Sequence, residues 1–174
     1  MTVTPLRSAR SVARTSRHLT LAPAELLEIA EGFARSAGSW PGLDSPVERC
    51  WRTIAVTDRF EAWVVAWPVG GAIELHDHGD AGGVVVVVTG RLVETALQPG
   101  SGGRVTTRST PVTGGGHVEF GPGHVHDLVN DGPVPAKSVH VYTPALRTMT
   151  YFDRRHEGVV AGRTEHYRDG LLVG

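Results

Sequence analysis

The pattern of apolar and polar positions divides the chain into a short helical part and a longer β-rich part. Within residues 23–35 (PAELLEIAEGFAR) the apolar side chains share one stripe of a helix: Leu26, Leu27, Ile29, Ala30 and Phe33. This pattern predicts one amphipathic helix that packs against the segments after it. Residues 36–46 are rich in Gly, Pro and Ser, which predicts a loop.

Between residues 52 and 143 the apolar positions no longer follow a helical period. Turn residues there bound seven β-rich runs, which are 52–56, 61–67, 82–89, 91–98, 117–120, 127–130 and 138–143. Thr89-Gly90 predicts a hairpin between the third and fourth runs. Many short strands after one or two helices predict a mainly β protein, an antiparallel sandwich or barrel, with a single domain over residues 20–174. The segment from Tyr151 onward has weak patterning, and we interpret Asp153, His156 and His166 as surface residues.

Composition narrows the function classes. The chain has 174 residues, enough for one domain with a core of its own, and a formal net charge of −1. That balance predicts no general attraction to nucleic acid or to an anionic membrane. The single cysteine, Cys50, excludes an intrachain disulfide, and the longest apolar run is too short to span a bilayer.

The first twenty residues carry four arginines and no acid. This composition is similar to that of an organellar transit peptide, but it is also typical of a disordered terminus. We expect residues 1–19 to form a flexible basic tail and the protein to be cytoplasmic.

Five of the nine histidines gather in two short clusters and a later strand. His76 and His78 are two positions apart, so in extended backbone their rings point to the same side. His124 and His126 form a second pair of the same kind. Because neutral imidazole is the commonest metal ligand in proteins, the two pairs predict a metal site.

The residues around these pairs resemble the two sequence motifs of the cupin superfamily. The first motif has a glycine before and after an HxH pair, here Gly70, His76, His78 and Gly90. The second runs from a glycine through a proline to H-x₃-N, here Gly116, Pro122, His126 and Asn130. This register favours His126 over His124 as the third ligand, and the resemblance implies a cupin, jelly-roll-like β-barrel.

One departure from the first motif changes the expected chemistry. Where cupins usually have a glutamate ligand, this chain has Gly82-Gly83. The remaining ligands are three neutral histidines, which leave a divalent metal its full charge and leave open positions for substrate and oxygen. Such a centre favours anionic ligands, for example a thiolate.

Taken together, these segments resemble the thiol dioxygenase family, whose type member is cysteine dioxygenase. The resemblance rests on residues 74–80 (ELHDHGD), residues 125–130 (VHDLVN) and residues 138–144 (SVHVYTP). It implies that Ser138, His140 and Tyr142 form a hydrogen-bonded row. It also implies that Arg52 pairs with a substrate carboxylate, and that the cysteine–tyrosine thioether of some members is absent, because Gly83 occupies the cysteine's position.

The function implied by the resemblance is oxidation of a small thiol carboxylate by O₂ to its sulfinate, with one Fe(II) per chain at His76, His78 and His126. L-cysteine is the favoured substrate and 3-mercaptopropionate the second choice. Another metal-dependent cupin enzyme and a non-catalytic ligand-binding cupin remain open alternatives. The expected partners are the thiol and O₂, with no nucleic acid and no membrane, in a monomer or weak homo-oligomer.

Overall fold

The computed structural model describes residues 20–36, 40–100, 105–155 and 158–173. The proposed basic tail, residues 1–19, and His156 lie outside these residues. The described part contains one helix, α1 (Pro23–Arg35), and twelve strands. The strands are β1 (Cys50–Val56), β2 (Glu61–Trp67), β3 (Ala72–His76), β4 (Gly82–Thr89), β5 (Arg91–Pro99), β6 (Val105–Thr113), β7 (His117–Phe120), β8 (His126–Val129), β9 (Ala136–Thr143), β10 (Thr148–Arg155), β11 (Gly158–Arg168) and β12 (Leu171–Leu172).

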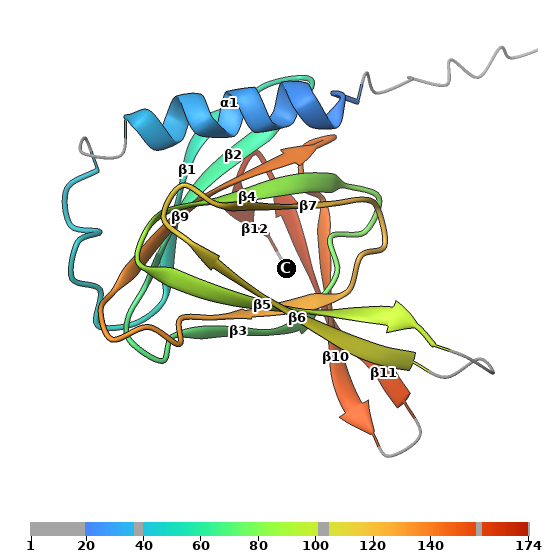
Figure 1. The fold of residues 1–174 in the computed structure, drawn as a ribbon. Coiled ribbons are helices and arrows are strands. Elements are labelled where there is room, and N and C mark those ends of the chain that lie inside the picture. The colour runs from blue at the N-terminus through green and yellow to red at the C-terminus, as the bar shows by residue number, and fades with distance from the viewer. Residues whose placement is uncertain (1–19, 37–39, 101–104, 156–157, 174) are drawn as a thin grey trace, which may run out of the picture.

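The strands form two antiparallel sheets that face each other and enclose the core (Figure 1). One sheet has the order β1-β2-β9-β4-β7, and the other has the order β12-β11-β10-β3-β8-β5-β6. Side chains from both inner faces, such as Trp63, Val85, Leu128 and Tyr142, pack into one buried cluster. This arrangement confirms the predicted mainly β, cupin-type barrel.

The helix α1 covers the outer face of the five-stranded sheet, across β4 and β9 (Figure 1). Leu26 and Ala30 are buried there against Val84, Val86 and Val141. Because β4 is buried on both faces, its sequence is a continuous apolar run rather than an alternating one. The predicted amphipathic helix, with its bounds, is confirmed.

The connection at Gly90 differs from the predicted hairpin. β4 pairs with β7 and β9, whereas β5 pairs with β6 and β8 in the opposite sheet. Gly90 therefore turns the chain from one sheet to the other. It has a φ of 78°, and a Cβ there would lie 2.7 Å from the Cβ of Ala136.

Five of the described strands were not expected from the sequence. These are β3, β6, β10, β11 and β12, and all of them belong to the seven-stranded sheet. The segment from Tyr151 onward, whose patterning is weak, contains most of β10 and all of β11, which form a long hairpin that pairs with β3.

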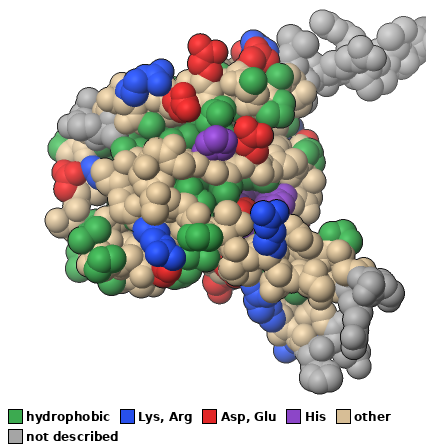
Figure 2. Space-filling model, in the orientation of Figure 1, with side chains coloured by type: hydrophobic (Ala, Val, Ile, Leu, Met, Phe, Trp, Pro, Cys, Tyr) green, Lys and Arg blue, Asp and Glu red, His purple; other side chains and the backbone are tan. Residues whose placement is uncertain are grey.

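Two features of the structure concern the expectation that the protein binds neither nucleic acid nor a membrane. On the face shown in Figure 2, acidic and basic side chains are interspersed rather than gathered into a patch of one sign. In the part of the chain that the structure describes, α1 is too short and too polar to cross a membrane.

Close packing at Gly83 gives a stability prediction. A Cβ at this position would lie 2.6 Å from the Val141 carbonyl oxygen and 2.7 Å from Cζ of Phe120. We expect Gly83→Ala to lower the free energy of unfolding by about 1–3 kcal/mol, since overpacking forces neighbours to shift. Gly121→Ala is the control, because a Cβ there has no neighbour within 4 Å. Urea denaturation measures both, and equal stability of the two variants would contradict the prediction.

Candidate metal centre

Three histidines from different parts of the chain converge between the two sheets. His76 is the last residue of β3, His78 follows two residues later in the loop, and His126 opens β8. His76 and His126 are direct partners in the antiparallel pairing of β3 with β8. All three side chains are buried. The candidate ligand nitrogens of the three residues lie within 4.8 Å of one another.

Hydrogen bonds to Nδ1 of His76 and of His126 leave Nε2 of both rings free, whereas Nδ1 of His78 is buried without a partner among the described residues. The Nδ1–H of His76 donates to the Glu74 carbonyl oxygen at 2.7 Å, which leaves Nε2 as the free lone pair. The Nε2 atoms of His76 and His78 are 3.2 Å apart. Metal–nitrogen bonds are about 2.0–2.1 Å long, so two ligands at right angles around one ion are separated by roughly 3 Å.

The protonation states of the three histidines also fit metal binding. Burial, and after it the neighbouring histidines, hold the pKa values of His76 and His78 well below their usual range. Burial lowers the pKa of His126 as well. Its Nε2 is buried and has no hydrogen-bond partner among the described residues. An orphaned, unprotonated imidazole nitrogen aimed at two others is what a divalent metal would satisfy, so the residues fit the predicted metal.

Glu94 on β5 supports this centre from behind. Its Oε1 lies 2.8 Å from Nδ1 of His126 and 3.0 Å from Nε2 of His124. Burial alone would raise the pKa of Glu94, but the hydrogen bonds from the two histidines outweigh it and lower the pKa to about 2. The carboxylate therefore fixes the proton of His126 on Nδ1 and turns Nε2 toward the other two ligands.

The same geometry separates the roles of His124 and His126. Each belongs to a group that could hold a metal, but only His126 belongs to the group with His76 and His78. His124 is partly exposed and points its Nε2 at Glu94. Both histidines contact the same carboxylate, but only His126 lies with His76 and His78, and it is the histidine that the motif register favours as third ligand.

Ser138, His140 and Tyr142 lie on one face of β9 and form a continuous hydrogen-bonded row. The Oγ of Ser138 is 2.8 Å from Nε2 of His140, and Nδ1 of His140 is 3.2 Å from the Tyr142 hydroxyl. The indole N–H of Trp67 donates to Ser138 at 2.8 Å. Trp67 was not singled out from the sequence.

The donors in this row can be ordered from Trp67. An indole N–H can only donate, so the Ser138 oxygen accepts it and the serine O–H is free to donate to Nε2 of His140. Burial lowers the pKa of His140 to about 3, so the ring is neutral and carries its proton on Nδ1. That N–H donates to the Tyr142 oxygen, which leaves the phenol O–H to donate elsewhere. Burial raises the pKa of Tyr142, so the phenol keeps its proton.

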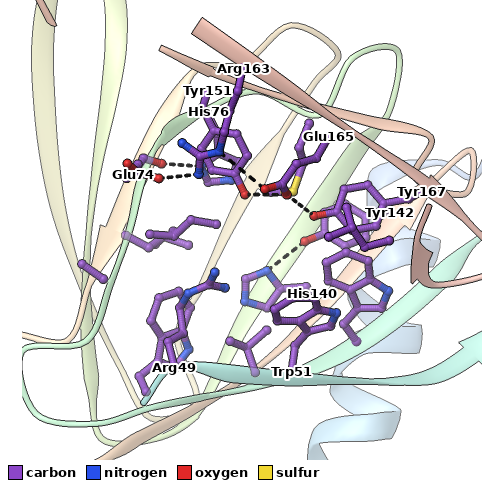
Figure 3. Close-up of a pocket in the computed structure, with 18 residues that line it drawn as sticks. Arg49, Trp51, Glu74, His76, His140, Tyr142, Tyr151, Arg163, Glu165 and Tyr167 are labelled. Atoms are coloured by element: carbon purple, nitrogen blue, oxygen red, sulfur yellow. Dashed lines mark hydrogen bonds and ion pairs between the residues drawn. The ribbon is translucent and has the colours of Figure 1, made fainter. Parts of the chain in front are cut away.

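A cavity of about 330 Å³ opens beside this row and His76. Figure 3 shows Tyr142, His140 and His76 facing it, with charged groups on its walls. Its aromatic lining consists of Trp51, Trp63, Trp67, Tyr142, Tyr151 and Tyr167. Its charged lining consists of Arg49, Glu74, Arg163 and Glu165.

The structure does not bring Arg52 to this cavity. Its side chain is exposed and contacts the Pro41 carbonyl oxygen at 3.4 Å. Along β1, Arg52 shares its face with Cys50 and Ile54, which pack on the outer side of the sheet. Side chains alternate in a strand, so Trp51 points inward and stacks on Trp63 at a centroid distance of 6.0 Å. The expected position of the carboxylate-binding arginine is thus on the wrong face.

Arg49 lies on the inner face, two residues before Trp51. Its guanidinium lies over the rings of Trp51 and Trp67, at 5.6 and 5.8 Å from their centroids. Among the described residues it makes no ion pair with a carboxylate. Sequence reasoning missed it because the resemblance pointed to Arg52 and the strand was placed to begin there.

The C-terminal hairpin supplies the opposite wall. Tyr151 of β10 and Arg163, Glu165 and Tyr167 of β11 all line the cavity. The last three are two positions apart, as the inward face of a strand requires, but two of them are charged, so no apolar alternation marked them. Asp153 and His166 are exposed, as expected for surface residues.

The barrel belongs to the cupin class and encloses three buried histidines that could hold a metal ion. Residues 22–155 match the family model described as cysteine dioxygenase type I. The chain therefore belongs to that family, which confirms the resemblance seen in the sequence.

Comparison with solved structures gives more distant likenesses. The protein TT1209 from Thermus thermophilus is 19% identical with a TM-score of 0.49, over 58% of this chain and 88% of that one. A protein with a double-stranded β-helix domain from Klebsiella pneumoniae is 23% identical with a TM-score of 0.45, over 68% and 88%. An oxalate oxidase is 22% identical with a TM-score of 0.46, over 56% and 52%. At these identities, nothing about the reaction follows from the likenesses.

Glu94 gives a prediction about metal affinity. Glu94→Gln removes the charge that orients His126, and we expect the affinity for a divalent metal to fall by about 10- to 100-fold. Glu119→Gln, at an exposed acid of β7 whose ion pair is with His117, is the control. Competition with a coloured chelator measures the affinity without any turnover. Unchanged affinity in Glu94→Gln would show that the carboxylate does not support the metal ligand.

Proposed function

We propose that this protein is an iron(II)-dependent thiol dioxygenase that converts a small thiol carboxylate and O₂ to the sulfinic acid. The observation that carries the proposal is the row from Trp67 to Tyr142, which ends beside the three-histidine group. The ring centroids of Tyr142 and His78 are 5.1 Å apart. Membership of the cysteine dioxygenase type I family supports the same reaction.

The reaction balances without a further reductant. The thiol R–SH takes up both atoms of O₂ to give R–SO₂H, so sulfur loses four electrons and dioxygen gains them. Iron held by His76, His78 and His126 would supply the oxygen chemistry and attract the thiol as its thiolate.

The protein's own residues supply orientation and a proton. Tyr142 keeps its O–H and directs it away from His140, so it can donate a hydrogen bond to a bound reactant. Aromatic side chains line the cavity beside that hydroxyl, and the lower local dielectric would strengthen the bond. Arg49 would hold the substrate carboxylate, since its planar guanidinium donates two parallel hydrogen bonds and cannot lose its charge. The two indoles fix the guanidinium in place without using its N–H donors.

Substrate-dependent oxygen uptake tests the proposal. Iron-loaded protein is supplied with L-cysteine, 3-mercaptopropionate and cysteamine, and the sulfinate is identified by mass spectrometry. We expect His76→Ala to lose both metal and turnover, whereas Tyr142→Phe keeps the metal and loses activity by on the order of 100-fold.

Each alternative function has its own outcome in this experiment. No sulfinate from any thiol would exclude a thiol dioxygenase acting on these substrates. Protein that holds metal but consumes no oxygen would favour a ligand-binding cupin. Oxygen uptake without sulfinate would favour a cupin enzyme with a different reaction, and full sulfinate formation in Tyr142→Phe would show that the reaction does not need this hydroxyl.

Two arginines three positions apart test how the substrate carboxylate is held. We expect Arg49→Ala to lower kcat/KM by about 10- to 100-fold, the value of a charged hydrogen-bond pair. Arg52→Ala should change it little, because that side chain lies on the outer face. A loss in Arg52→Ala with none in Arg49→Ala would restore the arginine expected from the sequence.

A further inference from the structure

Three aromatic side chains connect the metal centre with the surface of the protein. The ring centroids of His78 and Tyr142 are 5.1 Å apart, and those of Tyr142 and Trp63 are 5.3 Å apart in an edge-to-face arrangement. Trp63 stacks on Trp51 at 6.0 Å. Trp63 is buried, whereas Trp51 is 38% exposed. Tryptophan and tyrosine are easily oxidised, and contact between their rings lets an electron pass, so this series joins the three-histidine group to solvent.

The indole of Trp63 has an ionisable acceptor on its N–H. It donates to Oε1 of Glu61, whose side chain is fully buried. The other oxygen of this carboxyl group, Oε2, has no hydrogen-bond partner among the described residues. Burial raises the pKa of Glu61, so its carboxylate takes up a proton more readily than an exposed one. A neutral acceptor would satisfy the indole at a lower cost of burial, so the hydrogen bond alone does not explain a glutamate here.

A base beside an indole matters because loss of one electron makes the N–H strongly acidic. Trp63 can pass this proton to Glu61 as the electron leaves. Trp67 has no such base, since its N–H donates to a serine hydroxyl. Tyr142 cannot pass its proton to His140, because that ring turns an N–H toward the phenol oxygen. Trp63 is therefore the aromatic residue near the metal centre that is best placed to be oxidised reversibly.

We propose that Trp63 and Trp51 form an electron-transfer route that protects the metal centre when an oxidant reaches it without a thiol, and that Glu61 accepts the indole proton of Trp63. The route requires the iron of the proposed function, so the inference rests on that function, but it does not depend on thiol oxidation. Tyr142 lies between Trp63 and His78 and conducts the electron without losing its own proton.

Hydrogen peroxide is an oxidant for which the electrons can be counted. Its reduction to two water molecules takes two electrons, and solvent supplies the two protons. One electron comes from iron(II), which becomes iron(III), and the other comes from Trp63, whose indole proton goes to Glu61. Trp51 then gives an electron to the Trp63 radical, which takes its proton back from Glu61. The net change is one oxidised indole at Trp51, whose proton has gone to water.

The route ends at the surface, where the oxidised side chain can be repaired. The Arg49 guanidinium lies over the ring of Trp51 at 5.6 Å from its centroid, which disfavours a cation there. Trp51 is therefore oxidised as its proton leaves to water. A soluble reductant such as ascorbate can then return the electron. Without the route, the oxidant would attack the buried histidines that hold the metal.

Mixing iron-loaded protein with hydrogen peroxide, in the absence of thiol and O₂, tests the inference. Freeze-quench electron paramagnetic resonance should detect a tryptophan radical, assigned with ring-deuterated tryptophan, and Trp63→Phe should abolish it. Glu61→Gln keeps an acceptor for the indole but is no longer a base, so the radical should form on the order of 100-fold more slowly. Zinc-loaded protein, whose metal has no electron to give, is the control and should show no radical.

Peptide mass mapping after longer exposure to peroxide gives a second readout. Oxidised tryptophan should gather at Trp51 and not at Trp40, which packs on the outer side of the five-stranded sheet and is the matched control. Trp51→Phe and Trp63→Phe should each increase oxidation of the three histidines and the loss of iron. Trp40→Phe should change neither.

The outcomes separate the route from general oxidation. Equal oxidation of Trp40 and Trp51 would show attack by radicals in solution and overturn the route. An unchanged radical in Trp63→Phe would overturn it as well, and an unchanged rate in Glu61→Gln would overturn the assignment of Glu61 as the base. A Trp63 radical in a protein that oxidises no thiol would instead contradict only the proposed function.

Discussion

Burial of three unprotonated imidazoles at one point between the sheets is the constraint on which the rest of the site depends. A polar group removed from water must find a partner, and Nε2 of His126 has none among the described residues. The same burial lowers the pKa values of the rings, so their lone pairs stay available. The cost of desolvation is offset once the three nitrogens share a cation. The fold thereby favours the metal-bound state of its own core.

The polar row on β9 also satisfies its buried polar groups, but with hydrogen bonds between side chains. Trp67, Ser138 and His140 are buried in the core, but each hydrogen bond in the row satisfies the next group. Because the series begins with a donor that cannot accept, its direction is fixed along the whole row. Tyr142 is therefore the only member with a proton left to offer, and it lies where the cavity begins. The same hydrogen bonds thus satisfy the buried polar groups and leave the O–H of Tyr142 free to donate at the cavity.

The spatial grouping of the three histidines was easier to predict from the sequence than the charged wall of the cavity, because the histidine motifs are local in sequence. His76 and His78 are two residues apart, and the motif around His126 spans a few positions, so local spacing defines them. The expected position of Arg52 in the cavity was wrong because neighbouring side chains of a strand point to opposite faces. The family resemblance selected an arginine whose side chain lies on the outer face of the sheet. The predicted hairpin at Gly90 was wrong for a related reason. A turn residue shows where a strand ends but not which strand is its partner.

The C-terminal wall was beyond prediction because its inward residues are charged. Arg163 and Glu165 look like surface positions in the sequence, and only their pairing across β10 and β11 places them against the cavity. Arg163 stays half exposed and pairs with Glu74, whereas the less exposed Glu165 accepts hydrogen bonds from Tyr151 and Tyr167.

Charge balance connects this wall to the metal centre. A divalent ion on three neutral histidines keeps two positive charges, and Glu94 offsets one of them. Arg49 adds one positive charge, and the group of Glu74, Arg163 and Glu165 contributes one negative charge. The site as a whole then retains a single positive charge. A ligand with net negative charge would neutralise it.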